Sequence, residues 1–369
     1  MSTPTPAKNQ YLPDYVSPPG ETIHETLEGL GMTQNEFATR MGITPKTVTK
    51  LLQGDAPIRP DTALALEKVL NVPARFWNNL ETQYQEYLAR TKEAEELEKH
   101  AGWVTEFPFS DMAELAYVNS VKPAWQRVRE LLQFFGVASP AEWEMVWAKP
   151  DACFRHSAAL KSSSHALSAW LRQGEKGASA LDLPAYDPTR FQKNVSAVRE
   201  LICEPVEVFE PEMIRLCRES GVALLFEKPL PKVRVSGACR WLGDRPVILL
   251  SLRYKTDDHF WFTFFHESKH VLQCVKKRLF VDVPGEEHDD PKEKEANNFA
   301  RATLIPQARW TEFLQQHDFS GPRIQSFAKQ VGITPGIVVG QLQFQKKLRW
   351  ETKLNQLKCR FAWADEAGN

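Results

Sequence analysis

The sequence has almost no net charge, and it lacks a Cys-x-x-Cys pair and any long apolar run. Its 46 basic and 47 acidic residues give a formal charge of −1, so a nucleic-acid site has to be a local patch. The six scattered cysteines argue against a disulfide framework and against a thiolate zinc site, and they favour a reducing cytoplasm. Because no leader-type segment and no apolar stretch of about 18 residues occurs, we expect neither export nor a membrane anchor.

The length and the changes of pattern along the chain predict several domains of mixed, mostly helical structure. A chain of 369 residues with 42% hydrophobic content can bury more than one core, which excludes the collagen-like and disordered classes. The β-type runs at 222–226, 233–242 and 247–252 predict a small sheet near the C-terminal end. We predict five segments: a flexible arm (1–20), a five-helix helix-turn-helix domain (21–95), a helical connector (96–204), a domain with the sheet (205–310) and a C-terminal helical region (311–369).

Helix-capping residues near the N-terminus predict the helix-turn-helix unit. Thr33 and Glu36 form a capping box, Gly42 closes that helix, and Thr44 begins the next one, which ends at Gly54. In such units the second helix of the pair enters the major groove of DNA. The alternative is a helix-turn-helix that binds protein. The residues predicted to contact DNA are Thr33 and Gln34 on the backbone, and Thr44, Lys46, Thr47, Thr49 and Lys50 in the groove.

The strongest chemical motif is His-Glu-x-x-His at residues 266–270. On a helix this spacing places His266 and His270 on one face with Glu267 beside them, which is the geometry that grips one zinc ion. A catalytic zinc needs a third protein ligand, and Glu295 on a following helix is our prediction. Glu293 is expected to serve the helix cap and is the alternative ligand. Glu267 would then take a proton from the attacking water in peptide hydrolysis. Surface histidines or a purely structural zinc remain open.

A second helix pair near the C-terminus repeats the first. Residues 37–53 and 327–343 are identical at nine of seventeen positions, so both should be helix-turn-helix units. Residues Lys46, Thr49 and Lys50 of the first copy correspond to Gly336, Val339 and Gly340 of the second. Because this change removes phosphate donors and lets another backbone come close, we predict that this second helix pair packs against protein, either the peptidase core or another subunit.

The segment from about 205 to 345 resembles the ImmA/IrrE metallopeptidases of bacteria and phages. The resemblance rests on the run from Phe260 to His270 and on the run from Glu293 to Pro306. It implies a zincin-like domain, Zn²⁺ as cofactor, the two histidines and Glu295 as ligands, and Glu267 as the base. Characterised members cleave helix-turn-helix repressors. The pair Ser268-Lys269 departs from the small apolar pair found in many members.

Residues 18–90 are similar to the HigA-type antitoxins of the XRE helix-turn-helix class, through the runs 19–21, 31–38, 42–44, 61–66 and 76–80. The resemblance implies a dimer that binds palindromic double-stranded operator DNA. Such antitoxins also neutralise a ribonuclease toxin, and a toxin partner stays open for this chain.

Together these patterns predict an α+β, predominantly helical protein that acts as a cytoplasmic, dimeric DNA-binding regulator. Its zinc endopeptidase domain would cleave a repressor-like protein, or the chain itself, and so relieve repression. One alternative is a non-catalytic, antitoxin-like autorepressor of a toxin–antitoxin operon whose zincin domain serves as a sensor or a partner-binding module. Another is a peptidase whose helix-turn-helix domain docks on protein.

Overall fold

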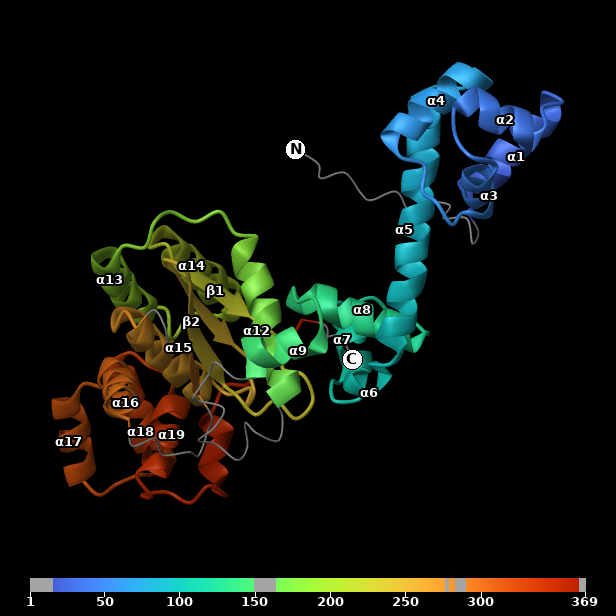
Figure 1. Ribbon diagram of the computed structural model, residues 1–369. Helices are drawn as coiled ribbons and strands as arrows, with labels where there is room; N and C mark the ends of the chain where they lie inside the picture. Colours follow the sequence, from blue (N-terminus) through green and yellow to red (C-terminus); the bar gives the residue numbers. More distant parts are fainter. Residues whose placement is uncertain (1–15, 149–163, 276–278, 283–289, 365–369) are drawn as a thin grey trace. The chain divides into compact units, whose positions relative to one another are not determined.

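The computed structural model describes residues 16–148, 164–275, 279–282 and 290–364 (Figure 1). The chain forms two compact units: one runs to His100 and includes Ala124–Gln126, and the other holds Ala101–Pro123 and everything from Arg127 onward. Residues 1–15 of the predicted flexible arm lie outside the described residues. The finer division of the second unit into three segments stays a prediction.

The first unit contains the five predicted helices. Its helix-turn-helix pair has the predicted caps: the Thr33 side chain accepts from the Glu36 N–H, the Thr44 side chain accepts from the Thr47 N–H, and Gly42 and Gly54 end the helices at φ values of 65° and 78°. Glycine adopts this left-handed conformation without steric cost. The helices are α1 (Pro19–Gly29), α2 (Gln34–Met41), α3 (Pro45–Gln53), α4 (Pro60–Leu70) and α5 (Ala74–Glu98).

A small apolar core holds this unit together. Phe37 of α2 and Val48 of α3 are completely buried, and so is Trp77 at the start of α5. Gly20 of α1 lies so close to the carbonyl of Leu52 that any side chain there would overlap it. The buried face of α3 is therefore fixed against α1, and the opposite face is left on the surface.

The second unit begins with short helices and a cluster of aromatic rings. Trp103, Phe107, Phe135 and Trp143 pack edge to face, and His165 stacks on Trp143 with 4.5 Å between ring centroids. Such contacts stabilise by about 0.5–1.5 kcal/mol each beyond the area they bury. The elements are α6 (Ala101–Val104), α7 (Phe109–Glu114), α8 (Ala124–Phe135), α9 (Pro140–Trp143), the π-helical turn η1 (Glu144–Ala148), α12 (Ser164–Ser179) and α13 (Pro188–Arg199).

A mixed four-stranded sheet with the order β1-β3-β2-β4 forms the centre of the second unit. The predicted strands are present, and the short edge strand β4 is an addition to the prediction. β1 and β3 are parallel, whereas β2 is antiparallel to both β3 and β4. The elements are α14 (Val206–Glu219), β1 (Ala223–Phe226), β2 (Gly237–Leu242), β3 (Arg245–Leu250), α15 (Asp257–Leu272) and β4 (Phe280–Asp282).

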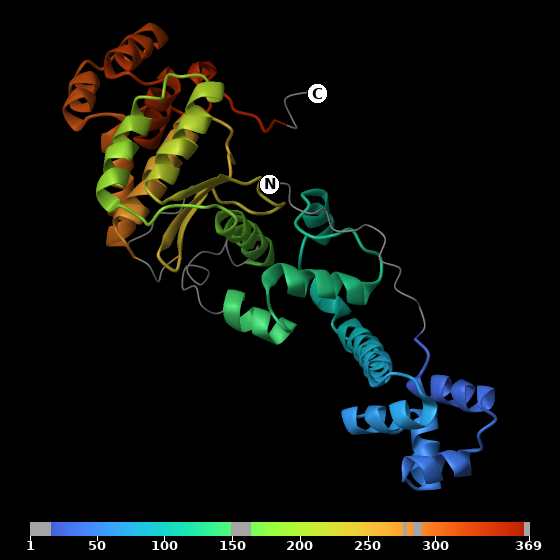
Figure 2. The same cartoon turned by 90° about the horizontal axis from the view of Figure 1, so that it is seen from above.

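Helices cover both faces of this sheet (Figures 1 and 2). Ile248 and Leu250 of β3 join the large core with α13, α14 and α15. Val247 points to the other face, where it packs with Ala178 of α12. This alternation is the one expected for a strand buried on both sides, and the predicted α+β class is confirmed.

The chain ends in a group of helices on the same side of the sheet as α15 (Figure 2). The Arg199 guanidinium of α13 donates to four carbonyls, two at the end of α16 and two at the end of α18. Among the described residues, no helix combines the length and the apolar character needed to cross a bilayer. The elements are α16 (Pro291–Leu304), α17 (Gln307–Gln315), α18 (Gly321–Val331), α19 (Pro335–Phe344) and the 3-10 turn η2 (Lys353–Leu357).

Candidate metal centre and nucleic-acid interface

The His-Glu-x-x-His motif lies on α15, the central helix of the second unit. Thr256 precedes the helix in an extended conformation, and acidic residues occupy its first turn, where the helix dipole favours negative charge. α15 packs directly on β2 at Gly237, because a Cβ at that position would lie 2.6 Å from Cγ2 of Thr263 and 3.1 Å from Oε1 of Glu267. The glycine therefore lets the motif helix and its glutamate approach the sheet.

The imidazoles of His266 and His270 converge with the carboxylate of Glu293. Their Nε2 atoms are 3.0 Å apart, and Oε2 of Glu293 lies 3.2 Å from the first and 3.3 Å from the second. All three residues are buried. Four ligands bound tetrahedrally to zinc at about 2.0–2.1 Å are separated by about 3.3–3.4 Å, so this triangle matches one face of such a site. The donor set fits zinc, with one position left for water or substrate.

The structure brings Glu293, and not Glu295, to the histidines. This corrects the sequence prediction of the third ligand. Asp290 does cap α16, but its side chain accepts from the Lys292 N–H, so Glu293 is not needed to close a capping box. The buried face of α16 is marked by Ala296 and Ala300. Glu293 lies on that face, whereas Glu295 lies about 200° around the helix from it.

Amide side chains hold both histidines from behind. Nδ1 of His266 is 3.1 Å from Oδ1 of Asn297, and Nδ1 of His270 is 3.1 Å from Oε1 of Gln273. A hydrogen on each Nδ1 that is donated to an amide oxygen leaves Nε2 with a free lone pair directed at the centre, which is the tautomer that binds metal. Gln273 in turn donates to Glu295 at 2.9 Å. Sequence reasoning did not identify these two amides, although Asn297 lies one turn after Glu293.

The charges at the centre also suit a cation. Burial alone raises the pKa of Glu293, but the two imidazoles that face its carboxylate together outweigh burial and hold the pKa well below its ordinary value. Burial lowers the pKa of His270, which keeps the ring neutral. A carboxylate and a neutral imidazole are the ligand forms that zinc requires.

Glu267 is fully buried between α15 and β2. Its charge and that of Glu293 add to the effect of burial and raise the pKa of the nearby Cys239 thiol well above its ordinary value. These charges and burial therefore favour the protonated form of the thiol. Glu267 is not one of the three converging side chains, and its role as the base stays a prediction.

Lys269, the departure from the family pattern, points away from the centre. Its ammonium group lies 2.9 Å from Oε1 of Glu295 and 5.5 Å from the centre of the Phe299 ring. The lysine therefore neutralises the exposed carboxylate that supports Gln273.

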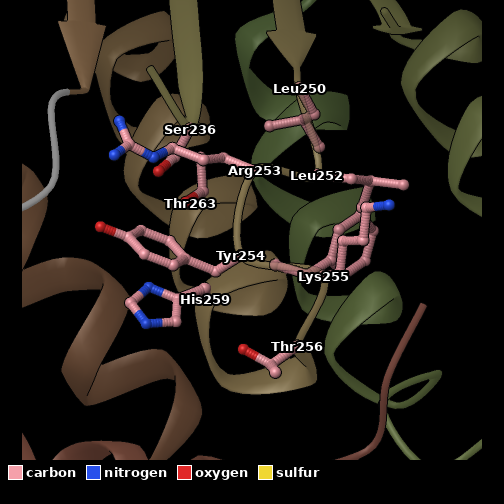
Figure 3. A pocket seen from close by; sticks show the side chains of 10 residues that line it. Ser236, Leu250, Leu252, Arg253, Tyr254, Lys255, Thr256, His259 and Thr263 are labelled. Atoms are coloured by element: carbon pink, nitrogen blue, oxygen red, sulfur yellow. The ribbon is translucent and has the colours of Figure 1, made fainter. Parts of the chain in front are cut away.

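A pocket opens at the N-terminal end of α15, where His259 stacks on Tyr254 with 4.2 Å between ring centroids (Figure 3). The guanidinium of Arg253 lies 5.1 Å from the centre of the tyrosine ring. None of these side chains belongs to the motif, but the spacing of His259, seven residues before His266, places it on the same stripe of α15.

The predicted DNA-contacting residues lie on the free side of α2 and α3 in the first unit. Six of them are exposed, and Thr47 is half-buried beside the hydroxyl of Thr44 at 2.9 Å. Lys46, Thr49 and Lys50 share one face of α3, opposite the buried Val48. Their base and phosphate contacts stay predictions. The exposed ones are Thr33, Gln34, Thr44, Lys46, Thr49 and Lys50.

The second helix pair, α18 and α19, packs against protein as predicted, and its partner is α15. A Cβ on Gly336 would overlap the carboxylate of Asp257, and one on Gly340 would overlap that of Asp258. Thr334, the counterpart of Thr44, donates its hydroxyl hydrogen to Asp257 at 2.5 Å. The surface that α3 leaves exposed is therefore buried in α19.

Comparison with known proteins finds matches in the N-terminal and in the C-terminal part of the chain. A helix-turn-helix family model matches residues 23–77, and a model of the IrrE N-terminal-like domain, of the M78 peptidase family, matches residues 217–338. An uncharacterized HTH-type transcriptional regulator, YddM of Escherichia coli strain K12, is 36% identical over 66 residues, which are 18% of this chain and 70% of the relative. A HigA-family addiction module antidote protein from Coxiella burnetii is 35% identical over 23% of this chain and 92% of that one, with a TM-score of 0.22.

The chain therefore belongs to the helix-turn-helix regulators through residues 23–77 and carries an IrrE-like domain of the M78 peptidase family over residues 217–338.

Proposed function

We propose that this protein is a cytoplasmic, dimeric transcription regulator whose zinc peptidase domain cleaves a repressor-like protein, or the chain itself, to relieve repression at its operator. The observation that carries the peptidase part is the buried triangle of His266, His270 and Glu293, with Glu267 beside it. The helix-turn-helix domain at the other end supplies the link to transcription.

Zinc held by the triangle would polarise the carbonyl of a peptide bond and make water more acidic. Glu267 takes a proton from the water that attacks the carbonyl carbon. It then gives that proton to the departing amide nitrogen as the C–N bond breaks. Asn297 and Gln273 hold the imidazoles in the metal-binding tautomer throughout.

The DNA-binding part rests on the exposed face of α3 and on its two lysines. Lys46 and Lys50 are one turn apart, so both ammonium groups reach phosphates or base edges on the same side of the helix. The alternative that the whole protein is an antitoxin-like autorepressor with a toxin partner shares this interface. It differs in what the metal centre does and in the toxin partner that it requires.

The metal site is tested by measuring zinc per chain by mass spectrometry in the wild type and in Glu293→Gln, with Glu295→Gln as the matched control. We expect about one zinc per chain in the wild type and in the control, and a loss in Glu293→Gln and in His266→Ala. A loss in Glu295→Gln with retention in Glu293→Gln would overturn the assignment of the ligands.

Catalysis is tested with Glu267→Gln, which keeps the ligands and removes the base. We expect this variant to bind zinc and operator DNA normally but to repress its operator permanently in cells, with its protein substrate uncleaved. If the variant responds to inducing conditions as the wild type does, the domain is a sensor or a partner-binding module and the autorepressor alternative holds.

A further inference from the structure

The pocket near His259 is a second feature of the peptidase domain that the proposed chemistry does not use. It lies where β2 begins, β3 ends and α15 begins (Figure 3). Arg253, Tyr254 and His259 lie on one side of it in this view, and Leu252 and Lys255 on the other. The lining residues are Ser236, Leu250, Leu252, Arg253, Tyr254, Lys255, Thr256, His259, Phe260 and Thr263.

The pocket follows the same stripe of α15 as the metal centre. His259, Thr263, His266 and His270 recur at helical spacing on one face. Thr263 lines the pocket and also packs against Gly237, next to Glu267. The seven residues from His259 to His266 span about 10 Å along the axis. An extended peptide covers that distance in about three residues.

The chemistry of the pocket favours negative charge. Among the described residues, the charged side chains that line it are Arg253, Lys255 and, when protonated, His259. The two acidic residues at the start of α15 are directed elsewhere: Asp257 accepts a hydrogen bond from α19, and Asp258 pairs with Lys358 at 2.6 Å. An arginine beside stacked rings offers a carboxylate both hydrogen bonds and a flat apolar wall.

The loop that carries these bases is held in an uncommon conformation. Leu252 and Lys255 have φ values of 52° and 53°, which side chains other than glycine rarely adopt. The Lys255 N–H donates to the Leu252 carbonyl at 3.0 Å, and the Phe361 N–H donates to the Lys255 carbonyl at 2.9 Å. Conformations of this kind persist where the surroundings fix them, and they cluster at binding sites.

We propose that this pocket is a substrate subsite that takes an aspartate or glutamate side chain about three residues from the bond that is cleaved. The inference rests on the proposed peptidase function and adds the substrate class: a peptide segment with an acidic residue at a fixed distance from the scissile bond. Arg253 and His259 bind the carboxylate, and the Tyr254 ring packs on its methylene groups.

The test measures binding apart from cleavage. Zinc-loaded, full-length Glu267→Gln protein is immobilised and exposed to a random decapeptide library, and the retained peptides are sequenced. We expect aspartate and glutamate to be enriched at one position. The enrichment should fall by about tenfold when Arg253→Gln is added and should persist in the matched control Arg309→Gln on α17. Arg253→Lys keeps the charge but loses the planar guanidinium, so it should retain only part of the enrichment. No acidic enrichment, or equal enrichment in the Arg253→Gln and Arg309→Gln proteins, would overturn the proposal.

Cleavage of the retained peptides by the wild-type protein separates this inference from the proposed function. Acidic peptides that bind in an Arg253-dependent way but are never cut support the subsite and count against the peptidase. Peptides that are cut with no preference for an acidic residue support the peptidase function and rule out the subsite.

Discussion

Two neighbouring acidic residues at the start of α15 should respond in opposite ways to the loss of their charge. Asp257 is completely buried against α19, and burial raises the pKa of its carboxyl to about 6, more than the hydrogen bond from Thr334 lowers it. Asp258 is also buried, but it forms an ion pair with Lys358, which donates to Gln343 as well. One carboxylate is therefore costly to ionise, and the other compensates a buried cation.

The size of the Asp257 effect follows from linkage. Because the folded-state pKa lies above the ordinary 3.8, the unfolded chain loses the Asp257 proton at a lower pH than the folded chain does. The stability that the protonated carboxyl contributes is therefore complete below pH 3.8 and is lost as the pH rises through about 6. The difference between the two pKa values corresponds to about 3 kcal/mol. Asp257→Asn should therefore raise the free energy of unfolding near pH 7.5 by up to about 3 kcal/mol and have little effect near pH 4. The asparagine oxygen can still accept from the Asp258 N–H, and the Thr334 hydroxyl can turn to accept from the new amide.

Asp258→Asn is the contrasting variant, and it should cost about 3–5 kcal/mol because it leaves Lys358 buried without its partner. Denaturant unfolding of the wild type and both variants, followed by tryptophan fluorescence at pH 4, 5.5 and 7.5, measures these differences. The other titrating groups are common to the wild type and Asp257→Asn, so the pH dependence of that difference reports on Asp257 and on its neighbour Asp258. A difference between Asp257→Asn and the wild type that does not change with pH, or that shrinks as the pH rises, would refute the reasoning.

Three further predictions concern the metal centre, the DNA interface and the helix contact. Replacing Gln273 by Leu should weaken zinc binding about 10–100-fold in a competition assay with a chelator, because His270 loses its Nδ1 partner; unchanged affinity would show that the amide does not orient the ring. Replacing Lys46 and Lys50 by Ala should weaken binding to all DNA sequences and reduce the slope of log K against log salt by about 2, as measured by fluorescence anisotropy, and an unchanged slope would place both lysines away from phosphate. Gly340→Ala should lower the free energy of unfolding by about 1–3 kcal/mol because its Cβ meets Asp258, whereas Gly321→Ala, whose nearest neighbour is 3.6 Å away, should have almost no effect.

Local signals in the sequence were enough to predict the first unit. Thr33 and Thr44 cap their helices, and the glycines that follow end them, because these features depend on residues within one turn of each other. The same is true of the two histidines on α15. The edge strand β4 was not predictable, because its three residues carry no alternation and are defined only by pairing with β2.

The choice between Glu293 and Glu295 shows where local reasoning fails and how it can be extended. A capping box is a local rule, and it assigned Glu293 to the cap. The burial pattern of α16 is a longer-range signal: Ala296 and Ala300 mark the inner face, and Glu293 lies on it. The helix had to be packed on α15 before the side chain could be assigned, because tertiary contacts and not the cap decide its direction.

The repeated helix pair makes the same point about function. Both copies have the Gly-Ile-Thr-Pro turn, so both fold alike, yet the threonine of the first copy caps an exposed helix and that of the second bonds to Asp257. Three substitutions, at positions that do not affect the helix caps, convert a face with two ammonium groups into one that a neighbouring helix can touch. Because that neighbour is α15, the second copy buttresses the helix that carries both histidines of the metal centre. The fold of a helix-turn-helix therefore follows from its turn, whereas its role follows from the few side chains that its outer face presents.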